Sequence, residues 1–448
     1  MKGQDMFAKV KSILENPFWV LYVVLFLIYA SAEKHAAIVL SIPRKAMLIV
    51  ACCILLYKVI TVPKMFMNKH TVIFAVFVCL NFITALIHRQ YNLFDNVSST
   101  LYIAVGGLLF LNQTYGKTRQ QVDREMLHIL KLNIYFPLLY AVIAVGMLIF
   151  NVSIILEENG AISAYGLYEN RLWGLYNANR AGAICFISIM ASLYLIWKYG
   201  RKKKFLYFNI GLQMFYLIMT QSRGSWIAFL GAAFLLIVFV FIGIDRMKTS
   251  SFKGRVRYLG ITIGVMAILI LMPKAIYKIT PMIMVSSEEE TEEEISFERI
   301  ENFEEGNLES VSNGRVELWK AGLEVWKQHP ILGVGMNNVH EYGQYFVSEK
   351  RAITMKGGLL HNLFLTALVS SGVVGFLVLM LFFVQLAVRC VKACFFQSDQ
   401  CNNILCAWIA GLIAINLVEN NLIYWNCIQA MVFWFVCSYF LYDTKKEK

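Results

Sequence analysis

Charged residues are scarce in this chain. They make up 16% of its 448 residues, whereas hydrophobic residues make up 58%. This scarcity excludes an ordinary soluble domain, which needs more polar groups to cover its surface. The sequence also lacks a nucleic-acid-binding motif, so we expect no nucleic-acid partner despite a net charge of +12. Basic loops that meet anionic lipid headgroups account for that charge.

Cysteine is absent from the long polar segment 274–360, although the chain has ten cysteines elsewhere. This absence excludes a disulfide framework in that segment. Four cysteines cluster near the C-terminus, but they have neither the spacing of a zinc site nor a neighbouring histidine. We interpret them as small packing residues and expect no metal site: they are Cys390, Cys394, Cys401 and Cys406.

Long apolar runs are what the chain has in abundance. A helix needs about 20 mostly apolar residues to cross a bilayer, and lipid cannot satisfy unpaired backbone groups, so each crossing must be helical. The first run lacks a convincing cleavage site and is expected to stay as a span. Twelve spans are predicted, roughly at 17–32, 46–60, 71–88, 99–113, 132–151, 180–197, 205–220, 225–244, 258–273, 361–388, 402–420 and 424–442.

The predicted fold is therefore an all-α polytopic membrane protein with about twelve transmembrane helices. Residues 1–273 would hold nine of them, residues 274–360 a large loop, and residues 361–448 the last three. If the N-terminus is cytoplasmic, the inner segments hold 25 of the 41 lysines and arginines. This asymmetry predicts a plasma-membrane or inner-membrane protein with both termini cytoplasmic and the large loop on the extracytoplasmic face.

The large loop contains two recognisable parts. The run 286–310 has eleven glutamates, all of them within 288–309, which favours a solvated segment; a cation site is the alternative. The following RVELWKAGLEVWKQHP has apolar residues at helical spacing, with Asn313 as a cap and Pro330 as a stop. It predicts an amphipathic helix, and its two tryptophans favour a position at the membrane surface.

Several polar residues fall on the predicted outer face. Arg223 lies in the short turn TQSRGSW, where a charge near the rim of the bundle is costly unless an anion compensates it. A helix that begins there also directs its positive dipole end outwards. Arginine suits phosphate oxygens, and a histidine at the start of a span exchanges protons near neutral pH. The candidate residues are Arg171, Arg180, Arg223, Arg315 and His361; for each, headgroup contact or helix capping is the alternative.

Four motifs in order resemble the superfamily of O-antigen ligases and O-antigen polymerases: RLWGLYNANRAG, SRGSW, NGRVELWKAGLEVWKQHPILGVG and HNLFLTALVSSGVVG. The resemblance covers roughly residues 171–375. It implies a glycosyltransferase C-type helical bundle acting on polyprenyl diphosphate-linked glycans. It further implies that Arg171, Arg223 and Arg315, with Arg180 less firmly placed, hold the donor diphosphate.

The same resemblance implies that His361 activates the acceptor hydroxyl. Asn362 is expected to orient either the imidazole of His361 or a substrate hydroxyl. Glu419 is a possible supporting carboxylate; a structural, hydrogen-bonded glutamate is the alternative. No metal or other cofactor is required, because arginines neutralise the leaving diphosphate. The expected partners are the lipid-linked donor, a glycan acceptor and the bilayer, with a flippase and a chain-length regulator as further candidates.

Two sister activities share these motifs. A polymerase joins the growing glycan to the next lipid-linked repeat unit, whereas a ligase passes the finished glycan to lipid A core or to protein. A lysine-rich composition with only 7 prolines favours a Gram-positive source, where no lipid A core exists, and hence a polymerase. A transporter or flippase of lipid-linked sugars is the alternative from another class, but the sequence shows no repeat of interrupted helices.

Overall fold

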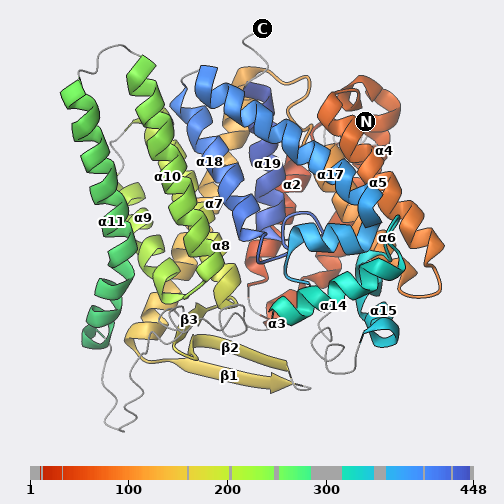
Figure 1. The fold of residues 1–448 in the computed structure, drawn as a ribbon, viewed down its shortest axis with the longest axis horizontal. Helices are drawn as coiled ribbons and strands as arrows, with labels where there is room; N and C mark the ends of the chain where they lie inside the picture. Colours follow the sequence, from red (N-terminus) through yellow and green to blue (C-terminus); the bar gives the residue numbers. More distant parts are fainter. Residues whose placement is uncertain are drawn as a thin grey trace, which may run out of the picture.

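The computed structural model describes residues 11, 14–32, 34–158, 161–200, 204–246, 252–283, 315–347, 360–396, 399–424 and 427–443. Within these ranges the chain is mostly helical (Figure 1). The longer helices are α2 (Phe18–Ala30), α4 (Ser41–Thr61), α5 (Lys69–Ile87), α6 (Leu93–Ala104), α7 (Arg119–Ile149), α8 (Ala178–Tyr199), α9 (Lys204–Met219), α10 (Arg223–Arg246), α11 (Phe252–Ile283), α14 (Arg315–Gln328), α17 (Leu363–Phe396), α18 (Gln400–Ile415) and α19 (Ile428–Asp443). Short helices are α3 (Lys34–Val39), η1 (Pro63–Phe66), η2 (Val105–Phe110), η3 (Met336–Asn338) and α15 (Val339–Phe346).

Each of the twelve expected spans overlaps one of these helices. Six helices in the described ranges are long and apolar enough to cross a membrane, and four shorter ones are apolar. The chain is therefore a helical, polytopic membrane protein, while twelve crossings stay a prediction. The glutamate-rich run 286–310 lies outside the described residues.

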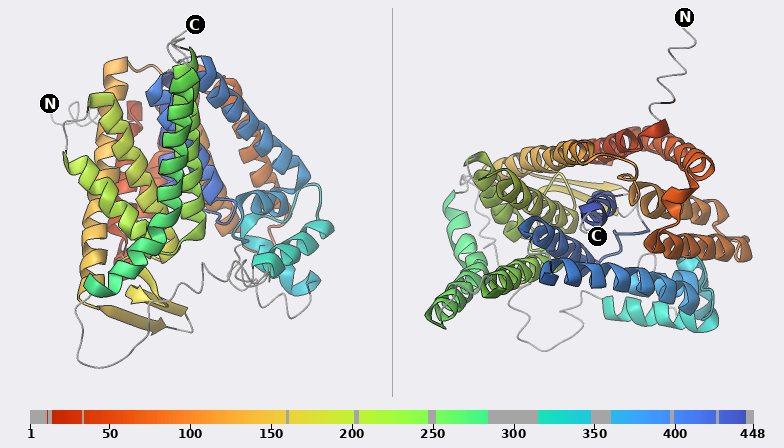
Figure 2. Two further views of the ribbon diagram at one scale, coloured as in Figure 1. Left: turned by 60° about the vertical axis from the view of Figure 1, so that its left-hand side comes forward. Right: turned by 90° about the horizontal axis from the view of Figure 1, so that it is seen from above.

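Three helices form the centre of the bundle. Most residues of α18, almost all of those of α19 and one continuous run of α8 are buried. Figure 2, seen from above, shows α19 enclosed by the other helices. Because apolar and small side chains are buried around most of the circumference of these helices, the helices pack against protein rather than lipid. Helices α8 and α18 position polar residues at one end of the bundle, because Asn179 lies on α8 and Glu419 follows α18.

A small antiparallel sheet covers one end of the bundle, between α7 and α8. Its strands are β1 (Ser153–Glu158), β2 (Ala161–Tyr168) and β3 (Arg171–Gly174), in the order β1-β2-β3. Glu169 and Asn170 have positive φ at the tight β2–β3 turn, a conformation that asparagine tolerates well. The predicted spans 132–151 and 180–197 leave this segment as a connection, and no strand was predicted in it.

The large loop is fixed to α17 by backbone hydrogen bonds. Helix α14 confirms the expected amphipathic helix, and the chain after it runs along a break in α17 at Gly372, where φ is 63°. Four loop–helix bonds span this break, two on each side, with N···O distances of 2.8 to 3.2 Å. A Cβ on Gly372 would lie 2.1 Å from the carbonyl oxygen of Ile331. The motifs HPILGVG and SSGVVG are therefore in direct contact.

Candidate functional site

Residues from six separate elements meet at the end of the bundle that carries the sheet and α14 (Figure 1). They are Arg171 on β3, Asn179 on α8, Arg223 on α10, Arg315 on α14, His361 before α17 and Glu419 after α18. Hydrogen bonds and shared cavity walls join them. Their convergence makes this end of the molecule the candidate site.

His361 is held in an unusual backbone conformation. Its φ is 46°, in the left-handed region that few residues other than glycine adopt. The next residue, Asn362, caps α17: its Oδ1 accepts the backbone N–H of Leu365 at 2.9 Å, and its Nδ2 donates to the carbonyl of Leu417 at 2.9 Å. Asn362 thus ties the start of α17 to the end of α18 and has these backbone partners rather than the imidazole.

Glu419 is the centre of the polar network. Its Oε1 accepts hydrogen bonds from Arg315 Nη2 at 3.0 Å and from Asn179 Nδ2 at 2.9 Å. Its Oε2 lies 3.3 Å from Nδ1 of His361. A carboxylate is only an acceptor, so it favours the tautomer with the proton on Nδ1. Nε2 of His361 is then left with a lone pair for a substrate proton.

Arg171 is buried, with 7% of its surface exposed, and it joins the network through Asn179. Its Nε donates to the carbonyl of Thr220 at 2.9 Å, and its Nη2 donates to Oδ1 of Asn179 at 2.7 Å. The Asn179 amide therefore bridges Arg171 and Glu419. An unbroken chain of contacts runs from the end of α9 through Asn179 to His361.

A small cavity, here called the arginine cavity, lies beside this network. Its volume is about 70 Å³, and Arg171, Arg223 and Arg315 line it together with Asn179 and Glu419. Arg223 begins α10, so the first backbone N–H groups of this helix reach the same place. Three guanidinium groups face one carboxylate, which leaves an excess of positive charge suited to phosphate oxygens.

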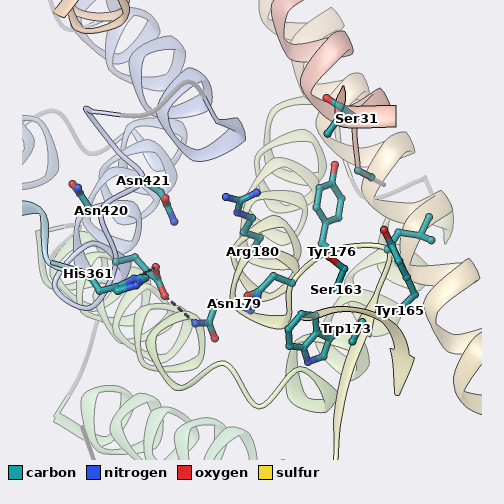
Figure 3. Close-up of a pocket in the computed structure, with 16 residues that line it drawn as sticks. Ser31, Ser163, Tyr165, Trp173, Tyr176, Asn179, Arg180, His361, Asn420 and Asn421 are labelled. Atoms are coloured by element: carbon teal, nitrogen blue, oxygen red, sulfur yellow. Dashed lines mark hydrogen bonds and ion pairs between the residues drawn. The ribbon is translucent and has the colours of Figure 1, made fainter. Parts of the chain in front are cut away.

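A second cavity, here called the aromatic cavity, lies on the other side of Asn179 and Glu419 (Figure 3). Its volume is about 500 Å³, within the usual range of about 300–1,000 Å³ for ligand pockets. His361 and Arg180 line it, together with Tyr165, Trp173, Tyr176, Ser31, Ser163, Asn177, Asn420 and Asn421. Asn179 and Glu419 also line the arginine cavity, so the two cavities share a wall.

The two other histidines of the large loop lie outside both cavities. The ring of His329 packs edge-to-face against His88 and Tyr342, with centroids 5.0 Å from each. Burial lowers the pKa of His329. Burial, and then the nearby His329, also lower the pKa of His88, which contacts the Tyr342 hydroxyl at 2.6 Å. His340 contacts Gln344. This cluster fixes the loop and has no direct part in the site.

Residues 208–380 match the family model of the O-antigen ligase domain. This match supports the resemblance to the O-antigen ligase and polymerase superfamily. No curated protein matches the chain. The match covers less than half of the 448 residues, and it includes Arg223, Arg315 and His361.

Other parts of the site in this O-antigen ligase-like protein lie outside the matched segment. They are Arg171, Asn179 and Arg180 before it and Glu419 after it. In the sequence Asn179 reads as an ordinary turn residue, and nothing in NANRAG distinguishes it from Asn177, which does cap α8. The aromatic cavity was not expected either, because it is formed by the sheet and by the chain between α18 and α19.

Among the residues that the structure describes, no group of three or more histidine, cysteine, aspartate or glutamate side chains is arranged to hold a metal ion. The positive groups of the site are arginines, and the carboxylate among them has arginine, amide and imidazole partners. The arrangement as it stands can bind an anion and move a proton beside it.

Proposed function

We propose that the protein is a polymerase of cell-surface polysaccharide. It would transfer a glycan from a polyprenyl diphosphate carrier to a hydroxyl of the next lipid-linked repeat unit, on the extracytoplasmic face of the membrane. The observation that supports this most is the His361–Glu419 pair, which stands between a cavity lined by three arginines and a cavity of sugar size.

In this mechanism Nε2 of His361 removes the proton of the acceptor hydroxyl. The acceptor oxygen then attacks the anomeric carbon, and the bond between that carbon and the diphosphate oxygen breaks. The diphosphate leaves with the electron pair, and Arg171, Arg223 and Arg315 stabilise its added charge. Glu419 orients His361 and stabilises the imidazolium that forms. Arginines thus fill the role that a divalent cation has in other enzymes that expel a diphosphate.

The match to an O-antigen ligase domain favours a ligase as the second candidate. A ligase would use the same donor chemistry but would pass the finished glycan to lipid A core or to a protein. The two activities differ in the acceptor alone, so the product distinguishes them.

The test uses the purified full chain in proteoliposomes with one substrate, a polyprenyl diphosphate-linked oligosaccharide repeat. A polymerase yields a ladder of lipid-linked products that differ by one repeat unit, without any other acceptor. A ligase leaves the substrate unchanged until an acceptor is added. His361→Ala should reduce transfer about 10²–10⁴-fold, whereas His340→Ala, outside both cavities, should leave it unchanged. Equal rates for His361→Ala and wild type would overturn the proposal, as would an activity lost in EDTA and restored by a divalent metal.

The proposed orientation is tested by thiol labelling in a cysteine-free background. Lys327 is exposed on α14 at the site end, and Arg124 is exposed on α7 at the opposite end. Lys327→Cys should react with an impermeant reagent in intact cells, or in spheroplasts if an outer membrane is present. Arg124→Cys should react only after lysis. The reverse pattern would place the site in the cytoplasm and refute an extracytoplasmic reaction.

A further inference from the structure

Arg180 lies apart from the other three arginines. It lines the aromatic cavity, whereas Arg171, Arg223 and Arg315 line the arginine cavity. Figure 3 shows its guanidinium between Asn421 on one side of the cavity and Tyr176 on the other. The residue is exposed, and it makes no hydrogen bond or ion pair with any residue in the described ranges. The diphosphate chemistry of the arginine cavity therefore leaves this cation unexplained.

The walls of the aromatic cavity suit a sugar ring. Three aromatic rings, those of Tyr165, Trp173 and Tyr176, offer flat apolar surfaces to the C–H face of a pyranose. Hydroxyl and amide groups beside them can bond sugar hydroxyls.

The arginine cavity cannot hold the same group. Its volume of about 70 Å³ is far below the range of about 300–1,000 Å³ for small-molecule pockets, so it admits phosphoryl groups and not a sugar ring. In the aromatic cavity a single guanidinium faces the ligand, and Glu419 already contributes a negative charge to the lining. One carboxylate matches one planar guanidinium in charge and shape, whereas a single guanidinium would leave most of the charge of a diphosphate uncompensated.

We propose that the aromatic cavity is a subsite for an acidic sugar, with Arg180 binding the carboxylate of a uronic acid residue in the glycan. The proposal rests on the proposed function, because it takes the ligand to be part of a glycan substrate. It narrows the substrate class to acidic polysaccharide repeats and makes Arg180 a specificity-determining residue rather than a ligand of the diphosphate.

Binding of small probes to the purified full chain tests this subsite separately from the diphosphate site. The probes are the methyl glycosides of glucuronic and galacturonic acid, their neutral counterparts methyl glucoside and methyl galactoside, and inorganic pyrophosphate, each followed by saturation-transfer NMR. At least one uronide should bind about tenfold more tightly than its neutral counterpart, as expected for a charge-assisted hydrogen bond. Arg180→Gln should abolish this preference, and Lys327→Gln, an exposed cation of α14, should preserve it.

Binding of pyrophosphate should depend on the arginine cavity. It should fall in Arg223→Gln and persist in Arg180→Gln. The proposal is overturned if neither uronide is preferred in the wild-type protein, or if the preference survives in Arg180→Gln. It is also overturned if Arg180→Gln weakens pyrophosphate as much as Arg223→Gln does. A uronide preference that needs Arg180, in a protein that does not bind pyrophosphate, would support this subsite and refute the diphosphate step of the proposed function.

Discussion

Replacing Glu419 by glutamine tests the centre of the proposed mechanism. Glutamine keeps the shape of the side chain but removes its negative charge. It also offers an N–H group where Arg315, Asn179 and His361 now find only acceptors. The substitution should leave the cavities in place and weaken the stabilisation of the imidazolium that forms when His361 takes a proton.

The size of the effect follows from the contact between Oε2 of Glu419 and Nδ1 of His361, which is 3.3 Å long. At this distance Coulomb's law gives about 1.3 kcal/mol in bulk water and about 5 kcal/mol at the effective dielectric constant of partly buried pairs. The side chain of Glu419 is 12% exposed and that of His361 40%, so solvent screening places the value in the lower part of this range. A loss of about 1.5–3 kcal/mol corresponds to a rate about 10- to 150-fold lower.

The assay is the transfer reaction in proteoliposomes, with kcat and KM measured separately. We expect Glu419→Gln to lower kcat, because the interaction with the imidazolium exists only once the proton has moved. Glu419→Asp, which keeps the charge, should recover part of the rate. Glu317→Gln on α14, where the carboxylate pairs with Lys320, is the matched control and should act as wild type. A wild-type kcat for Glu419→Gln, with unchanged thermal stability, would refute the reasoning.

Three further predictions concern the anion site, the loop and the break in α17. Arg223→Lys keeps the charge but loses the planar fork, so transfer should fall roughly tenfold or more at unchanged expression; full activity would make Arg223 a rim residue. Because burial lowers the pKa values of His88 and His329, the loop packing should be fully stable above the ordinary value of 6.5. It should become more sensitive to limited proteolysis as the pH falls below that value, since the unfolded loop then binds more protons; greater protection at low pH would contradict this. Gly372→Ala should cost about 2 kcal/mol or more in thermal unfolding, because φ is 63° and the methyl group meets a backbone carbonyl, whereas Gly231→Ala, in open space, should not.

The helices were predictable because a run of apolar residues has one stable conformation in lipid. The break in α17 was not, because SSGVVG fits a continuous span as well as an interrupted one. Only the approach of the loop backbone to Gly372 gives the break its hydrogen-bond partners. The strands Ser153–Glu158 and Ala161–Tyr168 were missed for a similar reason: each is short, and pairing with its neighbour defines it more than its own sequence does.

The charged part of the site was easier to find than its organisation. Arg223 stands out because charge at the rim of an apolar bundle is costly. Arg171, Arg315 and His361 stand out because arginine suits phosphate and histidine exchanges protons. The structure brings all four around Glu419 and Asn179. The sequence offered Glu419 in NLVENN as a possible supporting carboxylate but could not identify its partners. Its partners come from points 58, 104 and 240 residues away in the chain, and local sequence carries no information on such contacts.

Arg180 shows most clearly why residue type alone is insufficient. It was grouped with the other arginines because all four were expected on the same face of the membrane. Yet Asn179 and Arg180 are consecutive on α8, where successive side chains point about 100° apart. Asn179 takes the direction of Arg171 and Glu419, with both of its amide atoms bonded to them. Arg180 is therefore turned towards the aromatic cavity. One step along a helix separates a residue of the polar network around Glu419 from the residue that we propose binds the sugar.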